Sequence, residues 1–282
     1  MSTPEWHVLI TGPDRTMDDR AETLEPLALS IFEDGPRWRL EMWFDDEPAP
    51  DAVAHAIGVA IEAVTINPVA QKDWVTLSQQ ARPAVHAGRF WLYGTHEATA
   101  APQATIPILM DAGLAFGTGH HGTTSGCLIA LSHHAARKNR PFNALDLGTG
   151  TGVLAIAMAK LWPDAPIMAT DIDPVAIDVT RANAALNACT GRLALQTAPG
   201  LNHPTITGRA PYDLIVANIL AGPLIKMARD IASAMTYDGT LILSGLLRTQ
   251  ARAVQLAYRA QGLVLKDKID KDEWSTLVLE PA

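Results

Sequence analysis

From Phe142 onward, short apolar runs alternate regularly with stretches in which apolar residues recur at helical spacing. This alternation predicts helices at 152–161, 174–187, 220–235 and 248–260, and strands at 142–147, 166–171, 191–196, 212–217, 239–244, 262–268 and 274–280. Strands that alternate with helices of about 10–15 residues form a mostly parallel sheet with helices on both faces. The pattern therefore restricts this part of the chain to an open α/β fold.

The last two predicted strands are joined differently from the others. Only residues 268–273 lie between them, whereas a parallel crossover needs about a dozen residues. We therefore expect the sheet to end with an antiparallel hairpin strand, which a plain dinucleotide-binding fold does not have.

The first part of the chain predicts a separate, smaller domain. A strand at Trp6–Ile10, a helix at 15–28, a strand at 37–44 and a helix from Pro50 to about Val64 give a β-α-β-α order. This order suits a small two-layer α+β domain of ferredoxin-like type, although its last strand is not evident. We expect an α+β domain at 1–64, a linker region at 65–104 and an α/β domain at 105–282.

Acidic side chains are concentrated in the first domain. The chain has 22 Lys and Arg against 30 Asp and Glu, a net charge of −8, but residues 1–60 alone carry −9 and the remainder +1. Such a field repels nucleic acid phosphates and attracts a basic partner. A solvated acidic surface that only maintains solubility explains the same charges.

Several classes of protein are excluded by simple counts. No apolar stretch approaches the roughly 20 residues of a membrane helix, and the first residues do not have the pattern of a secretory signal. Cys127 and Cys189 are too few and too far apart for a disulfide scaffold or a cysteine-based zinc site. We therefore expect a cytoplasmic protein that is not associated with a membrane. We also expect a monomer.

A glycine-rich turn follows the first α/β strand. Asp146 precedes glycines at 148, 150 and 152, directly before a predicted helix. Glycines there let the backbone turn sharply and let a ligand approach the helix N-terminus, although a purely structural loop has the same composition. A dinucleotide fingerprint would require glycine at Val153. The spacing instead suits a ligand with an amino-acid moiety whose charged amine lies near Asp146.

Two acidic residues follow the next strand. A carboxylate at Asp171 is placed to accept hydrogen bonds from a ribose diol, as in other nucleoside-binding α/β folds. Asp173, directly before Pro174, is suited to cap the following helix. We assign diol binding to Asp171 and capping to Asp173.

The fourth strand ends at Asn218, which it delivers to the carboxyl edge of the sheet. The carbonyl of an asparagine can accept a hydrogen bond from a substrate amine. Base-modifying methyltransferases usually follow such an asparagine with two prolines and an aromatic residue, but Ile219 and Leu220 stand here. Direct recognition of a nucleobase is therefore not expected.

A further glycine-rich segment, residues 111–122, precedes the helix predicted at 123–137. Its glycines and Phe116 suggest a flap that closes over a ligand. Thr123 and Thr124 are suited either to this site or to ordinary helix capping. The pairs at 120–121 and 133–134 are histidines, but no zinc-binding spacing accompanies them, so no metal site is predicted.

Together these motifs resemble the bacterial PrmA family, the methyltransferases of large-subunit ribosomal protein eleven. The matching segments are G-T-G-x-H-x-T-T at 117–124, D-x-G-x-G-x-G at 146–152, D-I-D-P at 171–174 and N-I-L-A-x-P-L at 218–224. The resemblance extends over about residues 105–280. Residues 1–104 correspond in position to the substrate-recognition domain of that family.

The resemblance implies a seven-stranded, Rossmann-like class I methyltransferase sheet that binds S-adenosyl-L-methionine. It also implies N-methylation of lysine side chains and of the N-terminal amine of a basic ribosomal protein. By residue match, the cofactor contacts are expected at Thr124, Gly148, Gly150, Asp171 and Asn218, with Asp146 beside them and Phe116 packed over the cofactor. Asn218 is also the residue expected to position the amine in catalysis.

Three alternatives remain open at this point. The acceptor could be another protein lysine or a small amine. The domain could be a regulatory module that binds the cofactor without catalysis, although both Asp171 and Asn218 are retained. A nicotinamide-dependent oxidoreductase is the third, and Val153 and the hairpin ending argue against it.

Overall fold

The computed structural model describes residues 6–12, 17–24, 26–34, 37–68, 84–94, 101–110, 121–137 and 141–282. The chain forms two compact units, Met1–Ala81 and Arg82–Ala282. Among the described residues, the N-terminal unit has one sheet and one apolar core, and the C-terminal unit has two sheets and two apolar cores.

The N-terminal unit contains a four-stranded antiparallel sheet with the strand order β2-β3-β1-β4. Its elements are β1 (Trp6–Gly12), α1 (Met17–Ala21), η1 (Glu22–Leu24), β2 (Ala28–Asp34), β3 (Arg37–Phe44), α2 (Pro50–Ile57), η2 (Ile61–Ala63) and β4 (Val64–Pro68). Residues that alternate along the strands, including Val8, Ile10, Leu40 and Met42, pack against Met17 and Ile57 of the helices. One face of the sheet is thereby covered.

The prediction of a helix at 15–28 is wrong in its second half. Helical structure ends at Leu24, and residues from Ala28 onward form β2, which pairs with β3. Pro26 lies inside the predicted helix, and a proline there removes a backbone hydrogen bond and clashes with the preceding turn. The last strand of this domain, which was not evident from the sequence, is β4, and it pairs with β1.

The C-terminal unit contains a seven-stranded mixed sheet with the order β10-β9-β8-β11-β12-β14-β13. The strands are β8 (Ala144–Leu147), β9 (Ile167–Asp171), β10 (Leu193–Thr197), β11 (Tyr212–Asn218), β12 (Met235–Leu247), β13 (Leu263–Lys271) and β14 (Trp274–Pro281). The first five are parallel, and β14 runs antiparallel to both β12 and β13. The predicted antiparallel hairpin is thus present and consists of β13 and β14. Its second strand, β14, lies between β12 and β13, so β13 is the edge strand of the sheet.

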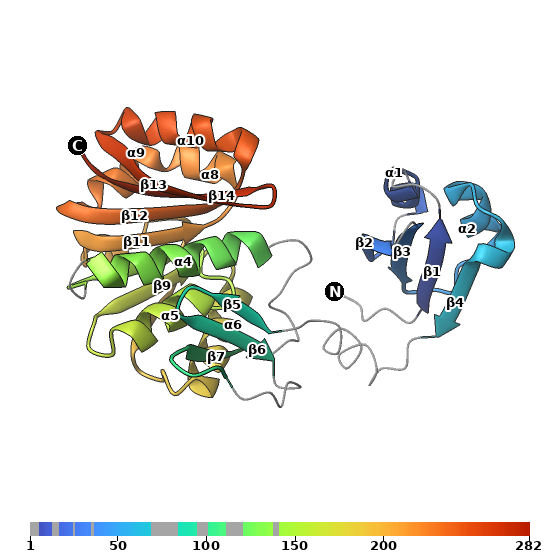
Figure 1. Cartoon of the computed structure of the whole chain (residues 1–282), viewed down its shortest axis with the longest axis horizontal. Coiled ribbons are helices and arrows are strands. Elements are labelled where there is room, and N and C mark those ends of the chain that lie inside the picture. The colour runs from blue at the N-terminus through green and yellow to red at the C-terminus, as the bar shows by residue number, and fades with distance from the viewer. Residues whose placement is uncertain are drawn as a thin grey trace. The chain divides into compact units, whose positions relative to one another are not determined.

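Helices cover both faces of this sheet (Figure 1). They are α4 (His121–Arg137), α5 (Val153–Leu161), α6 (Pro174–Leu186), α7 (Pro204–Thr207), α8 (Ala221–Lys226), α9 (Ala228–Ser233) and α10 (Arg248–Arg259). Alternate strand residues separate into two cores. One core packs against α4, α5 and α6, and the other against α7 to α10. The helix predicted at 220–235 is two short helices joined at Met227.

The region expected to be a linker contributes to both units. Residues 64–68 form β4 of the first sheet. Strands β5 (Val85–Ala87), β6 (Phe90–Gly94) and β7 (Ile106–Met110) form a small separate sheet. Phe90 and Ile108 are fully buried in the core that contains α4 and α5. Strands β5 and β6, which were expected in the linker region, are therefore packed with the α/β unit, whereas β7 was already expected there.

Candidate active site

Five of the predicted site residues lie at the carboxyl edge of the seven-stranded sheet: Asp146, Gly148, Gly150, Asp171 and Asn218. The chain winds from β8 to β9 and β10 on one side, and continues through β11 and β12 on the other. The strand order therefore reverses between β8 and β11, and ligands of open α/β sheets bind in the crevice at such a point. The glycine turn follows β8, and Asn218 ends β11.

The turn after β8 requires its glycines. Gly148, Gly150 and Gly152 have φ values of 76°, 55° and 83°, a region that side chains with a Cβ rarely adopt. A Cβ on Gly148 would lie 2.4 Å from Cγ2 of Ile219, whereas a Cβ on Gly150 would meet nothing within 4 Å. The turn is thus packed against the residue after Asn218 and open above Gly150.

Asp146 is completely buried beneath this turn. Its Oδ2 accepts hydrogen bonds from Thr149 Oγ1 at 2.7 Å and from the backbone N–H of Ala155 at 3.0 Å. Its Oδ1 is buried and has no hydrogen-bond partner within the described ranges. Burial raises the pKa of this carboxyl to about 7. A cationic donor at Oδ1 would offset the cost of ionising it.

The raised pKa of Asp146 predicts a pH-dependent stability. The folded protein favours the protonated acid, so this contribution is fully present below pH ~4 and is lost as the pH rises to about 7. The measurement is urea denaturation without cofactor, and the control is Asp146→Asn, whose side chain stays neutral. Between pH ~4 and about 7, the free energy of unfolding of the parent protein should fall by about 4 kcal/mol relative to that of the control. Parallel pH profiles for the two proteins would contradict the expected shift.

Asp171 ends β9 with its carboxylate fixed by two backbone donors. Oδ2 accepts a hydrogen bond from the N–H of Gly150 at 2.9 Å, and Oδ1 accepts one from the N–H of Asp173 at 3.0 Å. Each oxygen retains a further lone pair for a ligand. Asp173 caps α6 by accepting a hydrogen bond from the N–H of Val175 at 2.8 Å, which confirms its predicted role.

Asn218 contacts a residue distant in the sequence. Its Nδ2 lies 3.4 Å from Oγ1 of Thr124, to which it donates a hydrogen bond. Thr124 lies in the first turn of α4, which begins at His121, before the start predicted at Thr123. Thr123 and Thr124 therefore lie within the helix and do not occupy the capping position that precedes it. Two of the predicted site residues are thereby brought together.

Some sequence-based predictions lie outside the described residues or away from this edge. Phe116 lies outside the described residues, as do the glycine-rich segment that contains it and His120. His133 lies 3.6 Å from Asp267, and His134 packs edge-on against Trp162. Within the described ranges, no three His, Cys, Asp or Glu side chains are grouped to hold a metal ion.

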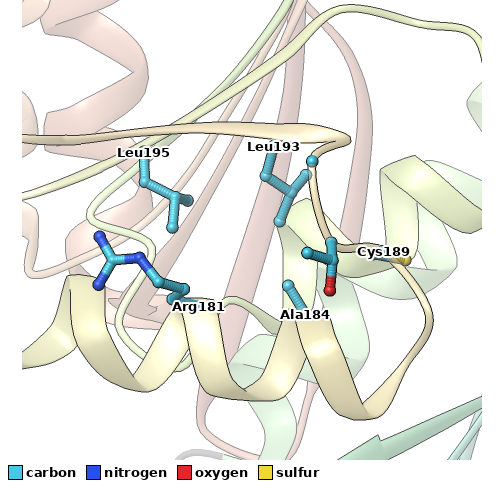
Figure 2. A pocket seen from close by; sticks show the side chains of 7 residues that line it. Arg181, Ala184, Cys189, Leu193 and Leu195 are labelled. Carbon is cyan, nitrogen blue, oxygen red and sulfur yellow. The ribbon is translucent and has the colours of Figure 1, made fainter.

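A separate cavity of about 280 Å³ lies between α6 and β10. Figure 2 shows Arg181 and Ala184 on the helix, facing Leu193 and Leu195 of the strand, with Cys189 in the loop between the two elements. None of the predicted site residues lines this cavity. It is therefore distinct from the crevice at the carboxyl edge.

Sequence reasoning missed three residues around the site. Ile219 contacts the glycine turn, and Ser244 and Gly245 of β12 contact the segments that carry Thr124 and Asn218. Serine and glycine within an apolar strand were the available signal, because an isolated glycine in a strand indicates a bulge or a close backbone approach.

Comparisons with known proteins place the chain in one family. The family model described as ribosomal protein L11 methyltransferase (PrmA) matches residues 37–281. A relative of that name from Brucella suis (strain ATCC 23445 / NCTC 10510) is 41% identical over 256 residues, which cover 90% of this chain and 89% of the relative. Another from Chelativorans sp. (strain BNC1) is 49% identical over 205 residues, which cover 73% and 70%.

A solved structure is also similar. The crystal structure of ribosomal protein L11 methylase from Lactobacillus delbrueckii subsp. bulgaricus has a TM-score of 0.61 and 27% sequence identity, and the match covers 70% of this chain and 97% of that one. The α/β methyltransferase fold with a mixed seven-stranded sheet is therefore shared. As a separate finding, no helix within the described ranges is both long and apolar enough to span a membrane.

Proposed function

This chain belongs to the ribosomal protein L11 methyltransferase (PrmA) family, and we propose that it transfers methyl groups from S-adenosyl-L-methionine to amines of that ribosomal protein. The observation that carries the proposal is the family match over residues 37–281, which includes every described residue of the candidate site. The acceptors we propose are lysine side chains and the N-terminal amine.

The residues at the sheet edge fit such a cofactor. The unpartnered Oδ1 of Asp146 suits a ligand that brings a cationic amine. The open space above Gly150 suits close approach of a ligand to the backbone, and the fixed carboxylate of Asp171 suits a ribose diol. When bound, the cofactor supplies an electrophilic methyl group on a sulfonium.

Asn218 is the residue that we propose positions the acceptor. Its Nδ2 donates to Thr124, so its carbonyl oxygen is left to accept a hydrogen bond from a neutral amine. Such a bond would hold the acceptor nitrogen in one orientation, which in-line transfer of a methyl group requires. An α-amine has a pKa of about 8 and lysine about 10.4, so the acceptor must lose a proton first, and an apolar pocket favours this loss. We propose no side chain as a general base.

We propose that the N-terminal unit is a ferredoxin-like domain that recognises the basic substrate. Its β-α-β-β-α-β order fits that fold. The sheet face opposite its helices carries His7, Glu41 and Trp43, with the two rings stacked at 5.1 Å and His7 Nε2 3.5 Å from a Glu41 oxygen. The adjacent His7 side chain holds the pKa of Glu41 below its usual range. An acidic unit with aromatic side chains on this face suits a basic protein partner.

Methyl transfer to ribosomal proteins tests the proposal directly. The protein is incubated with methyl-labelled cofactor and ribosomal proteins from a methylation-deficient strain, and we expect label in L11 alone. Label in another protein would support a different lysine as acceptor. Cofactor binding without transfer to any of these proteins would support a regulatory module. Calorimetric titrations with S-adenosyl-L-methionine and with NAD provide the cofactor control, and heat with NAD alone would favour an oxidoreductase.

A cytoplasmic location and a monomeric state are proposed together with this function. Two cysteines, Cys127 and Cys189, are free and buried, as expected for a reducing compartment. Sedimentation velocity at micromolar concentration measures the oligomeric state.

A further inference from the structure

Strand β12 is irregular where it passes the candidate site. Ser244 lies opposite Asn218 in the register of β11 and β12. The register of β12 with β14 shifts between Leu243 and Leu246, a stretch that contains Ser244. Gly245 lies within this shift and has a φ of 82°, a conformation that favours glycine. The strand therefore carries a bulge beside the amide of Asn218.

Gly245 brings the backbone of the bulge against the residue after Asn218. A Cβ on Gly245 would lie 2.3 Å from the carbonyl oxygen of Ile219 and 2.9 Å from its backbone nitrogen. The side chain of Ile219 is held on the other side, where a Cβ on Gly148 would be 2.4 Å away. Ile219 is thus confined between two glycines, which fixes the end of β11.

Ser244 connects the bulge to helix α4. Its Oγ is fully buried and lies 3.2 Å from the carbonyl oxygen of Thr123 and 2.9 Å from Oγ1 of Thr276 in β14. That same threonine oxygen would be only 2.1 Å from a Cβ at Gly126, so α4 packs closely on β14. These contacts fix the first turn of α4, in which Thr124 follows Thr123.

We infer that the Ser244–Gly245 bulge is a positioning element for methyl transfer, which sets the distance between Thr124 and Asn218. Ser244 holds the helix segment that carries the hydroxyl, and Gly245 holds the strand end that carries the amide. The inference rests on the proposed function, because it assigns the bulge a role only if Asn218 positions the acceptor. A displacement of about 1 Å at such a group can reduce a rate about 100-fold.

Two variants with matched controls test the inference. Gly245→Ala adds a Cβ that must displace the backbone of Ile219. Gly262→Ala is its control, because Gly262 has a nearly equal φ of 84° and nothing within 4 Å of the added Cβ. Ser244→Ala removes the buried hydroxyl. Ser132→Ala is its control, because Ser132 is also buried and lies away from the site. Its Oγ donates a hydrogen bond to the carbonyl oxygen of Leu128 and accepts one from the N–H of Arg89.

The measurements are the single-turnover rate with L11, the Kd for S-adenosyl-L-methionine and the Tm. We expect the rate to fall about 30-fold in Gly245→Ala and about 5-fold in Ser244→Ala, with Kd changed less than about 3-fold, while both controls keep the parent rate. If Gly245→Ala does not fold, the rate of Ser244→Ala alone tests the positioning role of the bulge.

The inference is overturned if the site variants lose no more rate than their controls, or if their losses follow Tm alone. If the parent protein transfers no methyl group to L11, the proposed function fails and the inference fails with it. If the parent is active and only the variant effects are missing, the inference alone fails.

Discussion

Asn218→Ala is expected to reduce the single-turnover rate of methyl transfer to L11 about 100-fold, while the Kd for S-adenosyl-L-methionine changes only a few-fold. The amide donates to Thr124 at 3.4 Å. We propose that this contact fixes the side chain so that its carbonyl oxygen accepts a hydrogen bond from the amine acceptor. Without the Asn218 amide, the acceptor amine is poorly oriented. Poor alignment in a methyl transfer lowers the transfer rate more than it lowers the affinity for the cofactor. Rapid-quench measurements with labelled cofactor give the rate, and calorimetry gives the Kd.

Gln261→Ala serves as the control for this substitution. Gln261 is an exposed amide in the turn after α10, so its loss tests the effect of removing an amide outside the site. A single-turnover rate for Asn218→Ala equal to that of the control would remove Asn218 from the mechanism. An equal loss in rate and in cofactor affinity would instead make it a cofactor ligand only.

Asp171→Ala is expected to raise the Kd for S-adenosyl-L-methionine about 100-fold. Hydrogen bonds to a charged group contribute about 1.5–3 kcal/mol each, and about 3 kcal/mol lost in total corresponds to a factor of about 100. The Gly150 N–H also loses its acceptor, which loosens the turn that approaches the cofactor. Isothermal titration calorimetry at fixed pH and salt measures the change.

Asp173→Ala is the matched control, since it removes a neighbouring carboxylate that caps α6. We expect this variant to lose about 1 kcal/mol of stability and to keep its cofactor affinity. If both aspartate variants weaken binding equally, the cause is a disturbed loop and Asp171 is not a diol ligand.

The alternation of strands and helices after residue 142 was sufficient to predict the α/β unit. Each predicted strand and helix there was found within a few residues of its expected position, apart from the split at Met227 and the longer β12. The short helix α7 was not predicted. The capping role of Asp173 was also predicted correctly. These features depend on residues close together in the sequence, and side-chain periodicity and capping act over that range.

Features that depend on distant contacts were predicted less well. Residues 28–34 form a strand because β3 pairs with them, although the residues before them have helical spacing. Residues 85–94 join the α/β unit because their apolar side chains are buried there. Neither the pairing partner nor the burial of a short apolar run can be read from local pattern.

The sequence by itself determined the order of the strands and main helices after residue 142, the glycine turn and the acids at 146 and 171, because these depend on local geometry. Only the tertiary structure decided that Thr124 meets Asn218, which is 94 positions away, and that Gly245 lies against Ile219. The reason is physical: a turn is specified by its own backbone, whereas a site assembled from several strands and a helix exists only when packing of the core fixes their positions.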